Sequence, residues 1–280
     1  MKQIIEWLLF TSVFAACCAV GLCMATEQLI IRHPPSLFSP LHTFVFGCTL
    51  MVYNAHHLMK RTTEKLSDRY VWSKHFMLWH YVCLVTGFIL LAVSLFFLSY
   101  KIWAWCLVLG CLSLAYSLPL LPFTRRKTIR EFGWIKIMVL TSVWTIVTSM
   151  LPMIYWNVSM LNYPYEILIR FVFMLTLCIA FDIRDMQTDL DAGIFTLPNI
   201  IGFKNSYRLM NFTIILFTML SAIQYLRFQS LPRFAGALIT AVVTKWVIDY
   251  VKIHSSDKAY LGLVDGVMLF YALSICLLNT

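Results

Sequence analysis

The sequence predicts an all-α, polytopic membrane protein, and three observations carry this prediction. Of the 280 residues, 60% are hydrophobic and only 12% are charged, whereas a soluble domain has about 25% charged residues. The mean hydropathy is +0.78. Apolar windows of about 20 residues, the length that crosses a bilayer as a helix, recur along the whole chain. No polar stretch is long enough for a soluble domain, so we expect one transmembrane domain over residues 1–280.

We predict nine transmembrane helices around a central cavity. The first apolar window follows Lys2 and resembles a signal peptide, but it continues past Cys17 and Glu6 interrupts its start, so we interpret it as an uncleaved helix. The predicted spans are 4–25, 40–60, 75–99, 102–118, 133–153, 163–183, 208–228, 233–252 and 259–278.

The distribution of lysine and arginine predicts the orientation in the membrane. Fifteen of these residues fall at the N-terminus or in the connections 60–74, 119–132, 184–208 and 252–258, and four fall on the opposite side. Cytoplasmic connections carry the excess of positive charge. We therefore expect an integral protein of the inner (cytoplasmic) membrane, with its N-terminus in the cytoplasm and its C-terminus outside.

Composition also argues against other classes of function. The net charge of +9 follows the pattern of membrane topology, so we expect no nucleic-acid partner and contacts with membrane lipids instead. The nine cysteines lie in or beside apolar runs and form no CxxC pair. They are interpreted as small apolar residues, not as disulfides or a zinc site.

The acidic stretch 181–198 is the feature on which the functional prediction depends. It has the sequence FDIRDMQTDLDAGIFTLP and holds four of the chain's 13 acidic residues. In a helix, Asp182, Asp185 and Asp189 share one face. Oxygen ligands grouped in this way suit Mg²⁺. The alternative is a solvated helix end, but polar groups at the end of a membrane-length helix usually face a cavity.

Two further groups are expected on the same side as the acidic stretch. At the end of the second span, Asn54, His57 and Arg61 share a helical face, and His56 is adjacent. Asn54 could bind a metal or a phosphate, and the histidines could act as ligand, base or cation; the alternative is contact with lipid headgroups. After the fourth span, a turn stiffened by two prolines is followed by three consecutive cations, which could hold a diphosphate or simply contact anionic lipid. These cations are Arg125, Arg126 and Lys127.

Lys136, Arg170 and Lys245 lie within predicted spans. Lys136 lies near the start of its span, and we expect its long side chain to extend to the membrane edge.

The stretch from Asp182 to Pro198 resembles the second aspartate-rich motif of the UbiA-type intramembrane prenyltransferases. The Gly-Ile-x-Thr-Leu-Pro that follows the aspartates makes this resemblance specific. Tyr116-Ser117-x-Pro119, with Arg125 and Arg126 downstream, is similar to the family's loop after the fourth span, at a longer spacing. The resemblance implies a nine-helix bundle in which two aspartate-rich motifs hold Mg²⁺ on a prenyl diphosphate, whose allylic cation alkylates an aromatic or other lipophilic acceptor.

The chain departs from the family pattern at the first motif, Asn-Asp-x-x-Asp-x-x-x-Asp. With its asparagine placed on Asn54, the three aspartates fall on Ala55, Leu58 and Thr62. The remaining charges are basic, and we expect His56, His57 and Arg61 to contact diphosphate in place of a metal.

The resemblance therefore assigns the metal to Asp182, Asp185 and Asp189, with Asn54 as a fourth catalytic residue. It makes Tyr116, Arg184 and the Arg125–Lys127 cations candidates for diphosphate binding. Three alternatives remain open at this point: a degenerate member that binds an isoprenoid lipid or a membrane partner, an intramembrane terpene cyclase, and a transporter, which the motifs do not favour.

Overall fold

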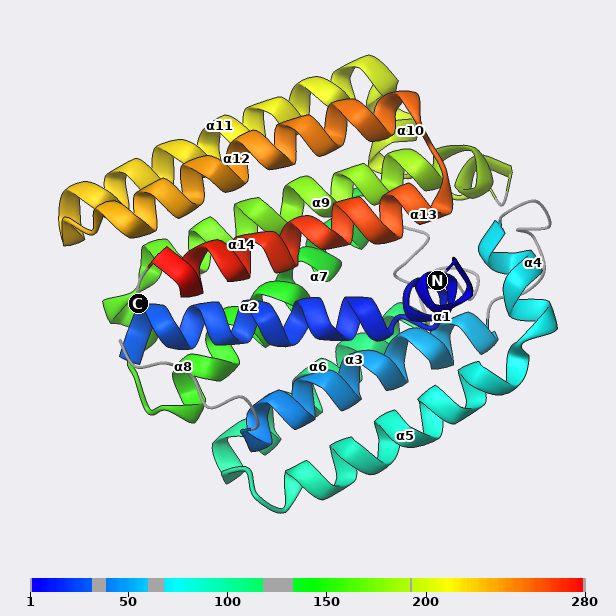
Figure 1. Cartoon of the computed structure of the whole chain (residues 1–280), viewed down its shortest axis with the longest axis horizontal. Helices are drawn as coiled ribbons and strands as arrows, with labels where there is room; N and C mark the ends of the chain where they lie inside the picture. Colours follow the sequence, from blue (N-terminus) through cyan, green and yellow to red (C-terminus); the bar gives the residue numbers. More distant parts are fainter. Residues whose placement is uncertain (1, 32–38, 60–67, 118–132, 192, 279–280) are drawn as a thin grey trace.

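The structure is a computed structural model, and it is built from helices (Figure 1). It describes residues 2–31, 39–59, 68–117, 133–191 and 193–278, and within these ranges there is no β-strand. The all-α prediction is confirmed. Helices are the expected solution for a chain in lipid, because a helix satisfies every backbone N–H and C=O within one segment.

The helices follow one another with short connections. In chain order they are α1 (Lys2–Phe10), α2 (Val13–Ile31), α3 (Pro40–Met59), α4 (Asp68–His75), α5 (Met77–Leu95), α6 (Tyr100–Ser117), α7 (Gly133–Thr145), η2 (Ile146–Met150), α8 (Leu151–Tyr155), η3 (Met160–Asn162), α9 (Pro164–Asp191), α10 (Leu197–Ile201), α11 (Phe203–Phe228), α12 (Leu231–Ile253), α13 (Asp257–Ala259), η4 (Tyr260–Val264) and α14 (Asp265–Leu278).

Six helical segments of the described chain are long and apolar enough to cross a membrane. They are Val13–Ile31, Met77–Leu95, Gly133–Tyr155, Phe203–Phe228, Leu231–Ile253 and Asp257–Leu278. The other predicted spans, 40–60, 102–118 and 163–183, correspond to α3, α6 and α9, which are also long helices. The presence of several membrane-length helices is confirmed, and the count of nine crossings stays a prediction.

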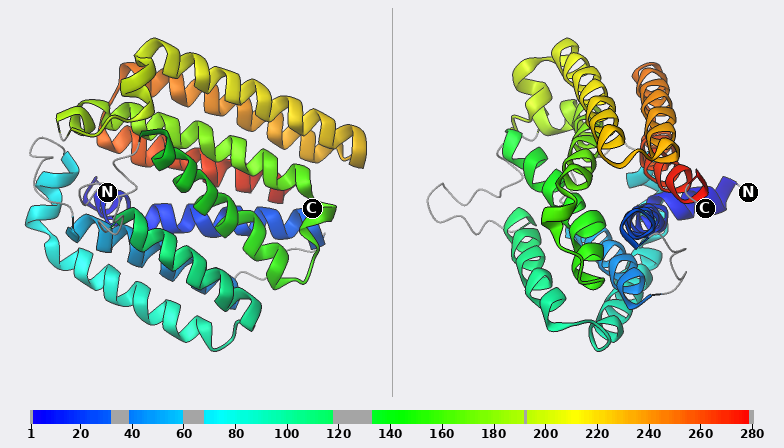
Figure 2. Two further views of the ribbon diagram at one scale, coloured as in Figure 1. Left: turned by 180° about the vertical axis from the view of Figure 1, so that it is seen from behind. Right: turned by 90° about the vertical axis from the view of Figure 1, so that its left-hand side faces the viewer.

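The long helices pack in a closed series. Helix α3 packs between α5 and α2, α2 packs on α14, and the series continues through α12, α11 and α9 to α7. The segment after α7 returns to α2, which joins the two sides of the bundle. In the left view of Figure 2 this segment crosses obliquely between α9 and α6. The N-terminus lies at the end where α9 finishes, which we call the acidic end, and the C-terminus lies at the opposite end (Figure 1).

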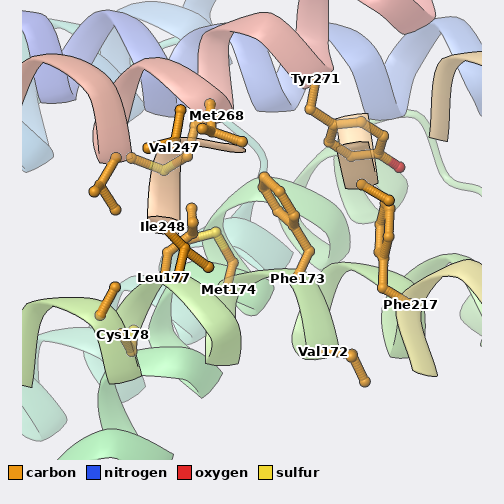
Figure 3. Packing of buried hydrophobic residues seen from close by; sticks show 14 of the residues in the cluster. Val172, Phe173, Met174, Leu177, Cys178, Phe217, Val247, Ile248, Met268 and Tyr271 are labelled. Carbon is orange, nitrogen blue, oxygen red and sulfur yellow. The ribbon is translucent and has the colours of Figure 1, made fainter. Parts of the chain in front are cut away.

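The main apolar core surrounds α9. Figure 3 shows Phe173 and Leu177 of α9 facing side chains of α11, α12 and α14. The Phe173 ring lies 5.1 Å from Tyr271 and 5.6 Å from Phe217 between centroids. Such aromatic pairs add a preferred geometry to van der Waals packing. The core thus fixes α9, and with it the position of the acidic stretch at the end of this helix.

The first predicted span, 4–25, is wrong in its boundaries. The chain forms the short α1, bends at Thr11 and Ser12, and continues as α2 to Ile31; Ser12 has φ 61°. Arg69 of α4 stabilises the bend, because its guanidinium donates to the carbonyl of Phe10 at 2.9 and 3.2 Å and to Ser12 Oγ at 2.9 Å. A side chain from 57 residues further along therefore satisfies the end of α1.

Polar side chains join the helices at the opposite end. Glu27 of α2 accepts from Trp156 at 3.0 Å and pairs with His42 of α3 at 2.9 Å. Arg170 of α9, which is fully buried, donates to Thr26 at 3.1 Å. Beyond these contacts, a small pocket between α11 and α12 is lined by residues that include Ser221, Gln224, Tyr225 and Arg233. The predicted central cavity stays a prediction.

The packing of α3 on α5 depends on two glycines. A Cβ at Gly87 would lie 2.7 Å from the carbonyl oxygen of Gly47, which is closer than packed atoms allow. We predict that Gly87→Ala lowers the thermal unfolding midpoint in detergent, at a cost of about 1–3 kcal/mol for overpacking. Gly110→Ala is the control, because nothing lies within 4 Å of the Cβ it adds. Equal midpoints for the two variants would contradict the prediction.

Candidate functional site at the acidic end of α9

Two aspartates of α9 meet one lysine of α7. The Nζ of Lys136 lies 2.8 Å from Asp182 Oδ1 and 2.8 Å from Asp189 Oδ2. All three residues are buried, with exposed fractions of 4%, 3% and 2%. The spacing of seven residues places both carboxylates on one face of α9, and α7 packs against that face. The predicted grouping of Asp182 and Asp189 is therefore present, with an ammonium group between them.

Asp185 has a different partner. Its carboxylate accepts two hydrogen bonds from the neighbouring Arg184, at 2.7 Å from Nε and 3.1 Å from Nη2. The guanidinium also lies over the Phe181 and Tyr260 rings, 5.0 and 5.8 Å from their centroids. Both side chains are partly exposed. Arg184, predicted as a diphosphate cation, thus lies at the rim of the site with its Nε and Nη2 engaged by the Asp185 carboxylate.

The Gly-Ile-x-Thr-Leu-Pro segment ends α9 and holds α7 against it. Gly193 has φ +73°, a conformation that glycine adopts without strain. Asn199 then donates to the carbonyl of Met186 at 3.2 Å and to Thr196 Oγ1 at 3.1 Å, which closes the turn. A Cβ on Gly133 would lie 2.4 Å from the Phe195 carbonyl oxygen. The start of α7 therefore touches this turn, and Lys136 follows one helical turn later.

Asn54 lies at the acidic end, in a buried hydrogen-bond network. Its Nδ2 donates to the carbonyls of Thr11 and Leu50 at 2.9 and 2.8 Å, and its Oδ1 lies 2.7 Å from His80 Nδ1. The other ring nitrogen of His80 lies 2.9 Å from Ser73 Oγ. Both ends of the Asn54 amide are therefore engaged in joining α3, α5 and the bend before α2.

The predicted histidines follow Asn54 on α3. The His57 ring stacks on His80 with centroids 4.3 Å apart, and His56 is half-buried. Four predicted cations, Arg61, Arg125, Arg126 and Lys127, lie outside the described residues. The backbone of Tyr116 belongs to α6, but its side chain is also outside the described part.

The donor chemistry of the aspartates fits Mg²⁺. Within the described ranges, no group of three or more His, Cys, Asp or Glu side chains converges as a metal site. Mg²⁺ does not need such a group, because it usually binds one or two carboxylates together with water and substrate phosphates. The buried Oδ2 of Asp182 has no hydrogen-bond partner in the described structure. This oxygen is an available ligand next to Asp185.

Sequence reasoning missed Lys136 and His80 as parts of the site. Lys136 does not extend to the membrane edge as predicted; it turns inward to the aspartates. The signal that could have identified it is its place inside an apolar span, because an intramembrane cation needs an anionic partner. His80 carries no comparable signal in the sequence.

Comparison with known proteins identifies the family. The model of the UbiA prenyltransferase family matches residues 57–273. The chain belongs to this family. No match to a curated protein sequence was found. The family match runs from His57 through the acidic stretch and into α14, so it includes Lys136 and the three aspartates but begins after Asn54.

Solved structures of UbiA homologues share the fold. A UbiA homologue from Archaeoglobus fulgidus bound to GPP and Mg²⁺ is 11% identical, with a TM-score of 0.61 and coverage of 97% of this chain and 99% of that one. The same homologue bound to DMAPP and Mg²⁺ is 13% identical, with a TM-score of 0.57 and coverage of 98% of this chain and 96% of that one. A digeranylgeranylglyceryl phosphate synthase is 14% identical, with a TM-score of 0.51 and coverage of 100% of this chain and 99% of that one. This chain therefore has the fold of UbiA-type membrane prenyltransferases.

The buried lysine should be essential for stability. We predict that Lys136→Met lowers the unfolding free energy by about 3–5 kcal/mol, because it leaves two buried carboxylates without a counter-charge. Lys245→Met is the matched control: its 2.6 Å contact with Asp249 is about half exposed, and such pairs contribute about 0–1 kcal/mol. Unfolding midpoints in detergent measure both. Similar losses in the two variants would refute the prediction.

Asn54→Ala should also destabilise the protein. It leaves the buried carbonyl of Thr11 without its donor and His80 without its acceptor, which costs about 1–3 kcal/mol. Asn211→Ala is the control, since the Asn211 side-chain oxygen has no hydrogen-bond partner among the described residues. The test is the unfolding midpoint of each variant, and an unchanged midpoint for Asn54→Ala would show that the network is not structural.

Proposed function

We propose that this chain transfers a prenyl group from a prenyl diphosphate to a lipophilic acceptor within the membrane. The observation that carries the proposal is the buried group of Asp182, Asp189 and Lys136, built on the motif that characterises the family. The solved homologue with GPP or DMAPP and Mg²⁺ supports this class of substrate. A buried ion cluster is costly to maintain in an apolar bundle, which favours a functional role.

Asp182, Asp185 and Asp189 are the proposed metal-binding residues. When bound, Mg²⁺ would neutralise the diphosphate as a leaving group. Arg184 lies beside Asp185 at the rim and is placed to contact the same diphosphate. We also assign His56, His57, Arg61, Tyr116, Arg125, Arg126 and Lys127 to substrate binding, with Asn54 supporting the site.

The reaction separates charge, and the chain's own residues bear on both products. The allylic C–O bond breaks and its electron pair leaves with diphosphate, which the cationic side chains of the rim attract. The prenyl cation that remains would be stabilised by the face of a nearby aromatic ring. The acceptor then donates an electron pair to the cation and loses a proton.

The acidic end is proposed to face the cytoplasm. The described helix ends there carry Arg69, Lys74, Lys204 and Lys252, whereas Lys101, Arg227 and Arg233 lie at the opposite end. In membrane proteins the cytoplasmic side carries the excess of lysine and arginine. A water-soluble prenyl diphosphate would then enter the site from the cytoplasm.

The test is diphosphate release by the purified protein in detergent or vesicles. We expect release from a labelled prenyl diphosphate that requires Mg²⁺, and a loss of about 10²–10³-fold in Asp182→Asn and Asp185→Asn, the magnitude typical for removing one transition-state-stabilising group. Asp249→Asn, at the exposed pair with Lys245, is the control and should retain activity.

Three other results would overturn the proposal or change its class. Saturable binding of the diphosphate without release would identify an isoprenoid-binding protein instead of a transferase. Release with a cyclised hydrocarbon product and no acceptor would identify a cyclase. Neither binding nor release of any prenyl diphosphate would reject the family's chemistry for this chain.

A further inference from the structure

The contact between Lys136 and the two aspartates has the features of an ion site occupied by a side chain. One Nζ bridges two carboxylates from successive parts of α9 at the same distance, 2.8 Å. Lys136 is 53 residues from Asp189 in the sequence, so the contact depends on the packing of α7 against α9.

The ammonium group uses the oxygens that a bridging metal would need. Asp182 Oδ1 and Asp189 Oδ2 both point to Nζ. Mg²⁺ binds carboxylate oxygens at about 2.0–2.1 Å, so the same two oxygens cannot hold a metal while Lys136 lies between them. Oδ2 of Asp182 is buried and has no hydrogen-bond partner in the described structure, so the lysine leaves this oxygen as a possible ligand.

The position of Lys136 is fixed by the backbone around it. Gly133, at the first residue of α7, approaches the Phe195 carbonyl so closely that a side chain cannot be added there. Helix α7 is thus held against the turn that follows the aspartates. Because Lys136 is one turn from this contact, its ammonium group is placed by the same motif that supplies Asp182 and Asp189.

We propose that Lys136 is a built-in cation that replaces a divalent metal between Asp182 and Asp189. A metal would then bind at Asp182 Oδ2 and Asp185, and Asp189 leaves the metal-binding set proposed above because the lysine occupies its Oδ2. This inference deepens the proposed function and rests on it for the role of the site in catalysis. It also agrees with the first motif, whose three metal-binding aspartates are absent from the sequence.

Mn²⁺ binding without substrate tests the proposal on the full-length protein. The probe is MnCl₂, followed by the loss of the free-ion signal in electron paramagnetic resonance. We expect Lys136→Met to bind Mn²⁺ at least about tenfold more tightly than the unmodified chain. Without the ammonium group, the oxygens of Asp182 and Asp189 that it contacted become free to bind the metal. Mn²⁺ should also raise the unfolding midpoint of this variant more than that of the unmodified chain.

Three control variants identify the source of the gain in Mn²⁺ affinity. Lys136→Arg keeps the positive charge and should show no gain. Lys245→Met removes a lysine from an exposed pair and should also show none. Adding Asp189→Asn to Lys136→Met should abolish the gain. An affinity of Lys136→Met equal to that of the unmodified chain, or a gain that survives Asp189→Asn, would overturn the proposal.

A second comparison does not depend on whether Lys136→Met folds. In the otherwise unmodified chain, Asp189→Asn should change Mn²⁺ affinity less than about threefold, whereas Asp182→Asn should lower it at least about tenfold. Equal losses in the two variants would show that a metal displaces the lysine, against the proposal. Because no prenyl diphosphate is present, these results stand whether or not the protein proves to be a transferase.

Discussion

The structure depends on the pairing of one buried lysine with two buried aspartates. Two carboxylates on one face of a helix repel each other, and removal from water increases the cost of each charge. Lys136 compensates this cost from a neighbouring helix, at 2.8 Å from both. The requirement explains why α7 must start against the turn after α9, and why glycine occupies position 133.

The acidic end contains two polar networks with different chemistry. The network around Asp182, Asp185 and Asp189 includes the buried Oδ2 of Asp182, which has no hydrogen-bond partner in the described structure, so it can accept a cation. The network around Asn54 and His80 is satisfied by its own donors and acceptors. Asn54, where the sequence predicted the start of the first aspartate motif, thus has a structural use, and the proposed chemistry lies on α9.

Much of this arrangement could be predicted from local sequence, and the remainder could not. Apolar length gave the membrane helices, and the seven-residue spacing placed Asp182 and Asp189 on one face. The contact with Lys136 depends on how two helices pack, and nothing in the spacing along the chain encodes it. The bend at Ser12 was missed for the same reason, because the arginine that stabilises it belongs to α4.

The π-helical turn at Ile146–Met150 sets the rotational phase between the two halves of the segment 133–155. Each residue of an α-helix rotates the chain by about 100°, and a π-turn accommodates one extra residue without ending the helix. Here the turn lets the carbonyl of Thr148 accept from Thr26 at 2.7 Å while Lys136, three turns earlier, faces α9. A chain one residue shorter at this point would keep one of these alignments and lose the other.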